Sequence, residues 1–405
     1  MSARREGDRI VLPGIATTHS HAFQRAMRGH VQRAPVPGSF WSWREAMFAL
    51  ADALDPESIY ALSHFAFVEL ALAGVTCVGE FHYVHHQSGG APYAERTVLS
   101  DAVIRAALDA GLRITLLRVV YERAGFGRAV EQGQRRFFDS RVELALGDVE
   151  TLRKSWASEP RVRIAIAPHS LRAVSRHSFE ACNLFAADQA MPIHAHVSEV
   201  PREVRECVAE HGRRPVELLA DLGVLGPRFT AVHATHLSPS EVQQLGASRS
   251  YACICRTTER DLGDGFPDIS GLVRAGAGIV TGVDSHASSC PFEEARAIEL
   301  DERPRTGART VALDADRLLL ALSNEAYASL GWQDASIDSV VLSANDPALV
   351  GASEARLNDA VIFGAGPRAV RDVIVAGARI VEDGRHARYD HARSAFVRAA
   401  STMGS

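Results

Sequence analysis

Eight short apolar runs rich in β-branched residues recur between residues 15 and 286 of this 405-residue chain, and each ends in polar or histidine-rich residues. Runs of this kind are typical of buried strands. They are Ile15–His21, Val75–Val84, Arg113–Tyr121, Val162–Ser170, Met191–Glu199, Phe229–Leu237, Ser250–Thr257 and Gly278–His286. Eight buried strands that alternate with helices predict an α/β fold, and the number eight favours a closed TIM (β/α)8 barrel.

Helical stretches lie between these runs. Apolar residues recur with a 3.6-residue period in segments such as Pro56–Ala73 and Pro201–His211. The competing fold is a doubly wound parallel sheet, which normally places a glycine-rich phosphate-binding turn after its first strand. Here the first run ends in the sequence HSH at residues 19–21. The barrel is therefore the favoured fold.

The hydrophobic pattern changes near residue 339. We expect the barrel to span residues 13–335. Residues 1–12 and 336–390 are interpreted as a small β-domain with a short N-terminal part, and residues 391–405 as a tail. Strands of the small domain are expected at Asp338–Leu342, Asp359–Ile362 and Asp372–Val381.

Charge and composition restrict the partners of the chain. The formal net charge is −5 and the basic residues form no stripe, which argues against binding to nucleic acid. No apolar run reaches the roughly 18 residues of a membrane span, and the first residues contain no apolar signal segment. The six cysteines form no CxxC pair, as expected for reduced thiols in the cytoplasm. We expect the protein to be cytoplasmic and to act on a small molecule. We also expect a homodimer, since dimers are common among such barrels.

Histidines and carboxylates gather where the predicted strands end, and these ends meet at one rim of a barrel. His19 and His21 alternate along the first strand, so both side chains face the same side and can chelate one ion. Other strands end with His169, His194, His196, Glu199, His233, His236, Asp284, Ser285 and His286. Imidazoles with one carboxylate suit Zn²⁺, with Fe²⁺ or Mn²⁺ as alternatives. The sequence therefore predicts a metal site with one position open for water.

We expect one metal per chain. Barrel hydrolases with two metals typically bridge them with a carboxylated lysine or a glutamate at the end of the fourth strand. That strand ends in His169, and Lys154, the only lysine of the chain, lies in the preceding helix. Zinc lowers the pKa of a bound water to near 7, so a zinc-bound hydroxide is the expected nucleophile.

Three residues are expected to handle protons. Glu199 lies three residues beyond His196, where its carboxylate can take a proton from the water and give it to a leaving nitrogen. His233 and Asp284 are placed to accept the proton of the water through hydrogen bonds. The predicted catalytic residues are therefore Glu199, His233 and Asp284.

Longer motifs resemble the amidohydrolase superfamily, and in particular its formimidoylglutamate deiminases. The resemblance runs from about Leu12 to Glu302 and includes LPGIATTHSHAFQRAMRG, FWSWRE, GEFHYVHH, APHSLRAV, IHAHVSE, VHATH and TTERDLGDG. The HxH pair is common to the superfamily, whereas SHAFQRAM, FWSWRE and HSLRAV are more specific.

The resemblance implies roles for individual residues. It implies that His19, His21, His196 and Asp284 bind zinc, that Glu199 and His233 transfer protons, and that Gln24, Arg44, Tyr83, His169 and Arg172 hold the substrate. The implied reaction is the hydrolysis of N-formimino-L-glutamate to N-formyl-L-glutamate and ammonia, a step of histidine degradation. A substrate with carboxylates needs cationic anchors, and arginine supplies bidentate geometry.

Two alternative functions and two departures from the family pattern remain. The alternatives are a related mononuclear deaminase or amidine hydrolase with a different small substrate, and an inactive barrel that serves as an assembly partner. Arg256 stands where a proline is expected, and it could bind an anion, pair with Glu259 or block the pocket. Val283 precedes Asp284 where the pattern has serine, which removes a hydroxyl group from the surroundings of that carboxylate.

Overall fold

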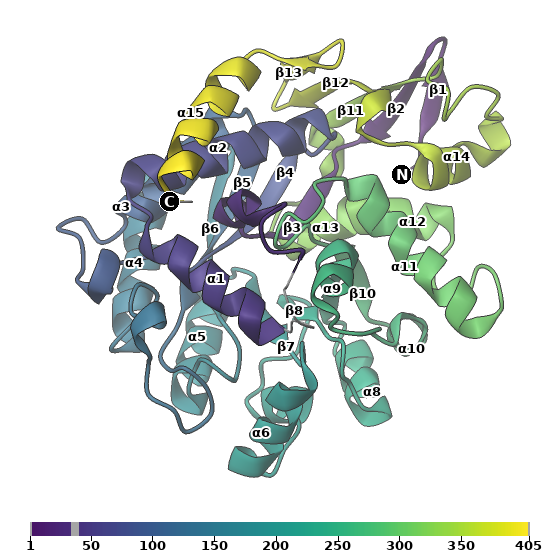
Figure 1. Cartoon of the computed structure of the whole chain (residues 1–405). Coiled ribbons are helices and arrows are strands. Elements are labelled where there is room, and N and C mark those ends of the chain that lie inside the picture. Colours follow the sequence, from purple (N-terminus) through teal and green to yellow (C-terminus); the bar gives the residue numbers. More distant parts are fainter. Residues whose placement is uncertain (1, 34–39, 404–405) are drawn as a thin grey trace.

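An eight-stranded parallel barrel forms the centre of the computed structural model, which describes residues 2–33 and 40–403 (Figure 1). Its strands follow one another around the sheet in sequence order, from β3 to β10. They are β3 (Ala16–Ser20), β4 (Cys77–His82), β5 (Arg113–Val120), β6 (Val162–Pro168), β7 (Ile193–Val197), β8 (Phe229–His233), β9 (Tyr251–Ile254) and β10 (Gly278–Thr281). The predicted (β/α)8 barrel is confirmed.

The first and last strands of the barrel meet at a seam beside the HxH motif. Ser20 and Asp284 form a parallel bridge there. The Asp284 N–H donates to the His19 carbonyl at 3.0 Å, and the His21 N–H donates to the Asp284 carbonyl at 2.9 Å. The two ends of the barrel sheet are therefore joined next to the predicted metal ligands.

Helices cover the outside of the barrel, and local signals fix their ends. The helix α2 begins with a capping box, in which the Asp55 carboxylate accepts the Ser58 N–H at 2.7 Å, and α6 ends at Gly212 in the left-handed conformation. The helices of the barrel region are α1 (Phe40–Asp52), α2 (Pro56–Leu72), α3 (Val98–Asp109), α4 (Val142–Ser155), α5 (Arg176–Asp188), α6 (Pro201–His211), α7 (Pro215–Asp221), α8 (Pro239–Ala247), α9 (Arg256–Leu262), α10 (Ile269–Ala275), α11 (Pro291–Thr306), α12 (Ala315–Leu322) and α13 (Asn324–Ser329).

A second, antiparallel sheet is built from both ends of the chain, as predicted, in the order β1-β2-β11-β12-β13-β14. β2 leads into β3 of the barrel and pairs with β11, with Leu12 opposite Val340. The strands are β1 (Arg4–Glu6), β2 (Arg9–Pro13), β11 (Ser339–Ser343), β12 (Val370–Val375), β13 (Ala378–Glu382) and β14 (Arg385–His386).

The strand predicted at Asp359–Ile362 is wrong, because these residues belong to the helix α14 (Leu357–Gly364). Leu357, Val361 and Ile362 are the buried apolar residues of this segment, and their spacing matches a helix face rather than a strand. The predicted tail, residues 391–405, is largely helical: the helix α15 (Tyr389–Met403) begins just before it and packs on α2. Residues 404 and 405 lie outside the described part of the chain.

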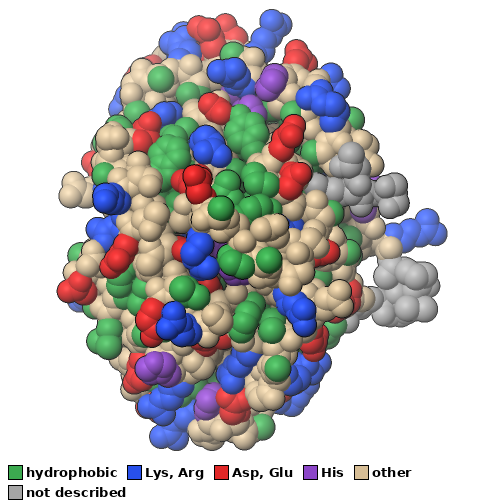
Figure 2. All heavy atoms as spheres, turned by 90° about the vertical axis from the view of Figure 1, so that its left-hand side faces the viewer, with side chains coloured by type: hydrophobic (Ala, Val, Ile, Leu, Met, Phe, Trp, Pro, Cys, Tyr) green, Lys and Arg blue, Asp and Glu red, His purple; other side chains and the backbone are tan. Residues whose placement is uncertain are grey.

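The surface agrees with the modest net charge. Acidic and basic side chains are interspersed over the face drawn in Figure 2. Within the described residues, no helix has the length and apolar character that crossing a membrane requires.

Candidate active site and metal centre

Four side chains converge at the seam of the barrel. Nε2 of His19 lies 3.1 Å from Nε2 of His21 and 3.2 Å from Nε2 of His196. Asp284 Oδ1 lies 3.4 Å from Nε2 of His19 and 3.3 Å from Nε2 of His21. All four residues are buried, and their ligand atoms lie within 4.8 Å of one another. The residues that the family resemblance implies as metal ligands thus form one cluster.

The hydrogen bonds of the rings orient this cluster toward a cation. His21 Nδ1 lies 2.9 Å from the carbonyl of Phe81, and His196 Nδ1 lies 3.1 Å from the carbonyl of His169. Because a carbonyl only accepts, each Nδ1 carries the proton, and each Nε2 keeps a lone pair directed at its neighbours. Lone pairs this close to one another and to a carboxylate repel unless a positive charge lies between them. This donor set fits a divalent metal such as Zn²⁺.

The protonation states of the cluster also suit a metal. Burial and the neighbouring His19 lower the pKa of His21 to about 3, and burial likewise holds the pKa of His196 well below its usual value. Burial alone would raise the pKa of Asp284, but its hydrogen bond and charge interaction with His19 hold that pKa below the usual range. Neutral imidazoles and an ionised carboxylate are the forms in which these side chains bind metals.

Glu80 of β4 supports the turn that carries the HxH motif. Its two carboxylate oxygens accept the Ser20 hydroxyl at 2.6 Å and the Ala22 N–H at 2.8 Å. Burial raises the pKa of Glu80 to about 8. Sequence reasoning did not select this residue, although it lies within the motif GEFHYVHH.

Glu199 and His233 lie next to the cluster. Glu199 Oε1 is 3.6 Å from His233 Nε2, which is 3.7 Å from Asp284 Oδ2. His233 (φ 70°) and Asp284 (φ 50°) both adopt the left-handed backbone conformation. For residues other than glycine this costs about 1–3 kcal/mol, and such strain concentrates at functional sites. The structure thus places all three predicted catalytic residues together.

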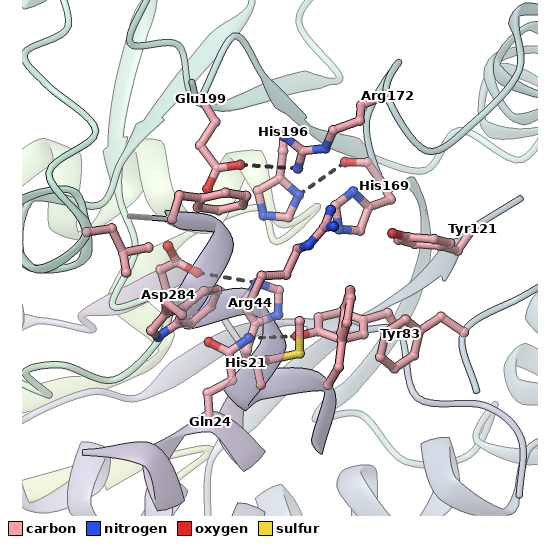
Figure 3. A pocket seen from close by; sticks show the side chains of 16 residues that line it. His21, Gln24, Arg44, Tyr83, Tyr121, His169, Arg172, His196, Glu199 and Asp284 are labelled. Atoms are coloured by element: carbon pink, nitrogen blue, oxygen red, sulfur yellow. Dashed lines mark hydrogen bonds and ion pairs between the residues drawn. The ribbon is translucent and has the colours of Figure 1, made fainter. Parts of the chain in front are cut away.

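Two arginines point into a pocket beside the cluster (Figure 3). Arg172 lies 3.3 Å from Glu199 Oε2 and 3.3 Å from Glu203 Oε2. The Arg44 guanidinium instead lies over the Trp41 ring, 4.6 Å from its centroid. Its Nε has no hydrogen-bond partner, and no carboxylate of residues 2–33 or 40–403 forms an ion pair with it. A buried guanidinium without a carboxylate is typical of an anion-binding position.

The other predicted substrate contacts line the same pocket. The Gln24 amide donates to the Tyr83 hydroxyl at 2.6 Å, while its own carbonyl oxygen has no partner. His169 Nδ1 lies 3.0 Å from the Ser170 hydroxyl, and its ring lies against the ring of His196 with 4.7 Å between centroids. Gln24 therefore offers the pocket an acceptor that the protein leaves unused.

An aromatic wall completes the pocket, and sequence reasoning missed it. Phe40, Trp43 and Met47 line the pocket from α1, at the three- and four-residue spacing of a helix face, which was the available signal. Tyr121 directly follows β5, so the strand-end rule could also have found it. Its hydroxyl accepts from the Gln134 amide at 2.8 Å, which leaves the hydroxyl proton available to a ligand.

Several candidate histidines lie away from the cluster. His194 Nε2 lies 2.9 Å from the Ser329 carbonyl, and His236 Nε2 lies 2.8 Å from the Asp264 carbonyl. His286 Nε2 contacts the Ser20 hydroxyl of β3. Each of these rings forms a hydrogen bond within the protein instead of joining the four convergent side chains.

The two departures from the family pattern have local explanations. Arg256 could bind an anion, pair with Glu259 or block the pocket, and in the structure it pairs with Glu259 at 2.7 Å. The backbone of Val283 is held without a serine hydroxyl, because its N–H donates to Thr17 Oγ1 at 2.9 Å and its carbonyl accepts from Thr258 Oγ1 at 3.3 Å.

The fold and the cluster define a class of protein: a (β/α)8 barrel with a group of histidines and an aspartate at the rim that could hold a metal ion. The sequence matches the model of the Amidohydrolase family over residues 10–378. It is 39% identical to a formimidoylglutamate deiminase from Pseudomonas aeruginosa over 402 residues, which cover 96% of this chain and 88% of the relative.

Solved structures agree with this assignment. The structure of an amidohydrolase from Brucella melitensis superposes with a TM-score of 0.91 and 34% sequence identity, covering 98% of this chain and 90% of the other. An adenosine deaminase from Xanthomonas campestris with bound zinc shares the fold, with a TM-score of 0.79 and 22% identity, over 97% and 87% of the two chains. The chain belongs to the amidohydrolase family and is a hydrolytic enzyme.

Proposed function

We propose that this enzyme binds one zinc ion and hydrolyses N-formimino-L-glutamate to N-formyl-L-glutamate and ammonia. The observation that carries this proposal is the pair Arg44 and Arg172, whose guanidinium groups both reach one pocket next to the metal-ligand cluster. Arg44, which has no carboxylate partner among the described residues, can bind one carboxylate of the substrate. Arg172 can bind the second if it exchanges its contact with Glu199 or Glu203 for the substrate. The similarity to the Pseudomonas deiminase supports the same substrate.

His19, His21, His196 and Asp284 are the residues that would hold the metal. A divalent metal bound there supplies Lewis-acid activation of a water molecule. Zinc is the proposed ion, and Fe²⁺ and Mn²⁺ are the alternatives for the same donors.

Protons are moved by the side chains beside the cluster. Glu199 moves both protons of the water to the nitrogen that leaves, the first as the water attacks the formimino carbon and the second from the hydroxyl group formed there. The carbonyl of the formyl product then forms as the C–N bond breaks and ammonia departs. His233, with Nε2 3.6 Å from Glu199 Oε1 and 3.7 Å from Asp284 Oδ2, stabilises the charge that develops on the water. Gln24, Tyr83 and His169 orient the substrate from the wall of the pocket.

The aromatic wall from α1 favours a second candidate, in which a planar heterocycle stacks in the pocket and is deaminated. Arg44 argues against it. A neutral heterocycle would leave this buried guanidinium without a counter-charge.

The test measures ammonia release from N-formimino-L-glutamate and from adenine by zinc-loaded protein of known metal content. The proposal expects release only from the formimino compound. Glu199→Gln should lower kcat by at least about 10²-fold, as expected when a proton-transfer group is lost, with zinc content unchanged. Zinc-loaded protein that releases no ammonia from N-formimino-L-glutamate would overturn the substrate assignment.

A further inference from the structure

We propose that Glu259 is a positioning residue that fixes the orientation of the His233 imidazole, and that Arg256 holds Glu259 in place. The role of His233 rests on the proposed function, whereas the link between the three side chains concerns the folded protein alone. Glu259 and Arg256 do not contact the substrate, but they support His233, which lies next to it.

The first link joins His233 to Glu259. His233 Nδ1 lies 3.3 Å from Glu259 Oε1, and the same oxygen accepts the Cys255 N–H at 2.9 Å. Both side chains of the pair are fully buried. Because an ionised carboxylate only accepts, Nδ1 must be the donor in this contact. His233 Nε2 is thereby directed at Glu199 and Asp284.

The second link joins Glu259 to Arg256. Both residues belong to α9, three positions apart, so they lie on one face of that helix. Arg256 Nη1 donates to Glu259 Oε2 at 2.7 Å and to the Gly265 carbonyl at 3.0 Å. Its Nη2 lies 2.7 Å from Asp301 Oδ2 on α11. A continuous chain of contacts thus runs from α11 through Arg256 and Glu259 to His233.

This chain gives a function to the arginine that departs from the family pattern. Arg256 is 1% exposed, so it cannot serve as a surface charge. It neutralises the outer oxygen of Glu259 and limits the positions that the carboxylate can adopt. Groups that hydrogen-bond to the functional side chains of metal sites typically change activity about 10- to 100-fold when they are removed.

His233, Cys255 and Glu259 could also be interpreted as ligands of a second metal, since their ligand atoms lie within 4.8 Å of one another. The neighbouring groups argue against it. Both oxygens of Glu259 already accept hydrogen bonds, and one of them faces the guanidinium of Arg256 at 2.7 Å. A second cation would lie beside that positive charge.

The decisive variant is Glu259→Gln. The neighbours of Glu259, namely His233 Nδ1–H, the Cys255 N–H and Arg256, are all donors. The amide NH₂ of a glutamine must therefore face a donor in either orientation. We expect kcat for ammonia release to fall about 10- to 100-fold with KM changed less than about twofold. Arg256→Met should give a loss of the same kind, and Arg256→Lys should recover part of it.

Arg260→Met is the matched control. Arg260 also pairs with Asp301, but its side chain is 40% exposed and forms no hydrogen bond or ion pair with Glu259 among the described residues. This variant should keep the wild-type kcat. If Arg260→Met and Arg256→Met lose equal activity, the effect lies in the packing of α9 on α11 and the proposal is overturned.

A second readout does not depend on the substrate. Nitrogen-15 NMR of labelled histidines should show a protonated Nδ1 for His233 in the wild type, assigned by the loss of its signals in His233→Gln. We expect those signals to shift or broaden in Glu259→Gln and Arg256→Met and to stay unchanged in Arg260→Met. Unchanged signals in Glu259→Gln, or two zinc ions per wild-type chain that fall to one in this variant, would overturn the positioning role. If Glu259→Gln does not fold, Arg256→Lys tests the same link.

Discussion

Replacing Arg44 by methionine should separate binding from stability. Arg44 lies at the pocket with its guanidinium over the Trp41 ring and with no carboxylate partner among the described residues. If it binds a substrate carboxylate, the substitution removes a charge-assisted hydrogen bond of about 1.5–3 kcal/mol. At about 1.4 kcal/mol per factor of ten, kcat/KM for N-formimino-L-glutamate should fall about 10- to 150-fold.

The stability of Arg44→Met should change little. The variant loses stacking on aromatic rings, about 0.5–1 kcal/mol, but it also removes a buried charge without a counter-ion. Arg118 provides the contrast, because it is 1% exposed and is bonded to Asp139 at 2.6 Å and Asp148 at 2.6 Å. Arg118→Met removes the buried cation between Asp139 and Asp148, of which Asp148 keeps its ion pair with Arg96 at 2.8 Å, and should cost about 3–5 kcal/mol. Thermal and urea unfolding of both variants measures the difference.

The assay uses three substrates: N-formimino-L-glutamate, N-formimino-L-alanine, which lacks the side-chain carboxylate, and N-formimino-4-aminobutyrate, which lacks the α-carboxylate. If Arg44 binds one carboxylate, the variant and the wild type should have similar kcat/KM on the analogue that lacks it. An equal loss on all three substrates would refute the reasoning, since the effect would then be independent of the anion.

Two further predictions follow from packing and burial. A Cβ added at Gly282 would lie 2.6 Å from the His19 Cβ and 2.9 Å from the Cys255 Sγ, so Gly282→Ala should lower the unfolding free energy by about 1–3 kcal/mol and reduce the zinc bound at limiting metal. A Cβ added at Gly147, in the interior of α4, would meet no atom within 4 Å, so Gly147→Ala should raise the unfolding free energy by about 0.5–1 kcal/mol. Equal effects of the two variants on melting temperature and zinc content would contradict this prediction. Burial raises the pKa of Glu294 from 4.5 to about 8, so the folded state binds more protons than the unfolded state between these values. The unfolding free energy of the wild type should therefore fall, relative to that of Glu294→Gln, as pH rises from about 5 to 8, by at most about 1.4 kcal/mol per pH unit. The glutamine side chain of the variant does not titrate. If urea unfolding gives parallel pH profiles for the two proteins, the raised pKa of Glu294 is disproved.

Much of this arrangement follows from the period of a strand. Because side chains alternate, His19 and His21 had to share a face, and because parallel strands end at one rim, Asp284 had to approach them. Those two rules, applied to eight apolar runs, led to the barrel, which the structure confirms.

Depth along a strand could not be predicted in this way. His194 and His196 lie on the same face of β7, about 6–7 Å apart along the strand, yet only His196 joins the cluster while His194 contacts Ser329. The register of β7 against its neighbours decides this, and register does not appear in a two-residue pattern. The helix α14 was missed for a related reason, since a four-residue apolar segment fits either period.

The pairing of β2 with β11 has a mechanical consequence. β2 leads into the first barrel strand and β11 follows the last barrel helices, so the small sheet holds together the two chain segments that enter and leave the barrel. The bridge between Ser20 and Asp284 closes the same seam from inside. Loss of the small sheet would free both ends of the barrel segment, and opening of the seam would pull β2 and β11 apart. We therefore expect the barrel and the small sheet to unfold in a single cooperative transition, because the small sheet holds the two sides of the seam together.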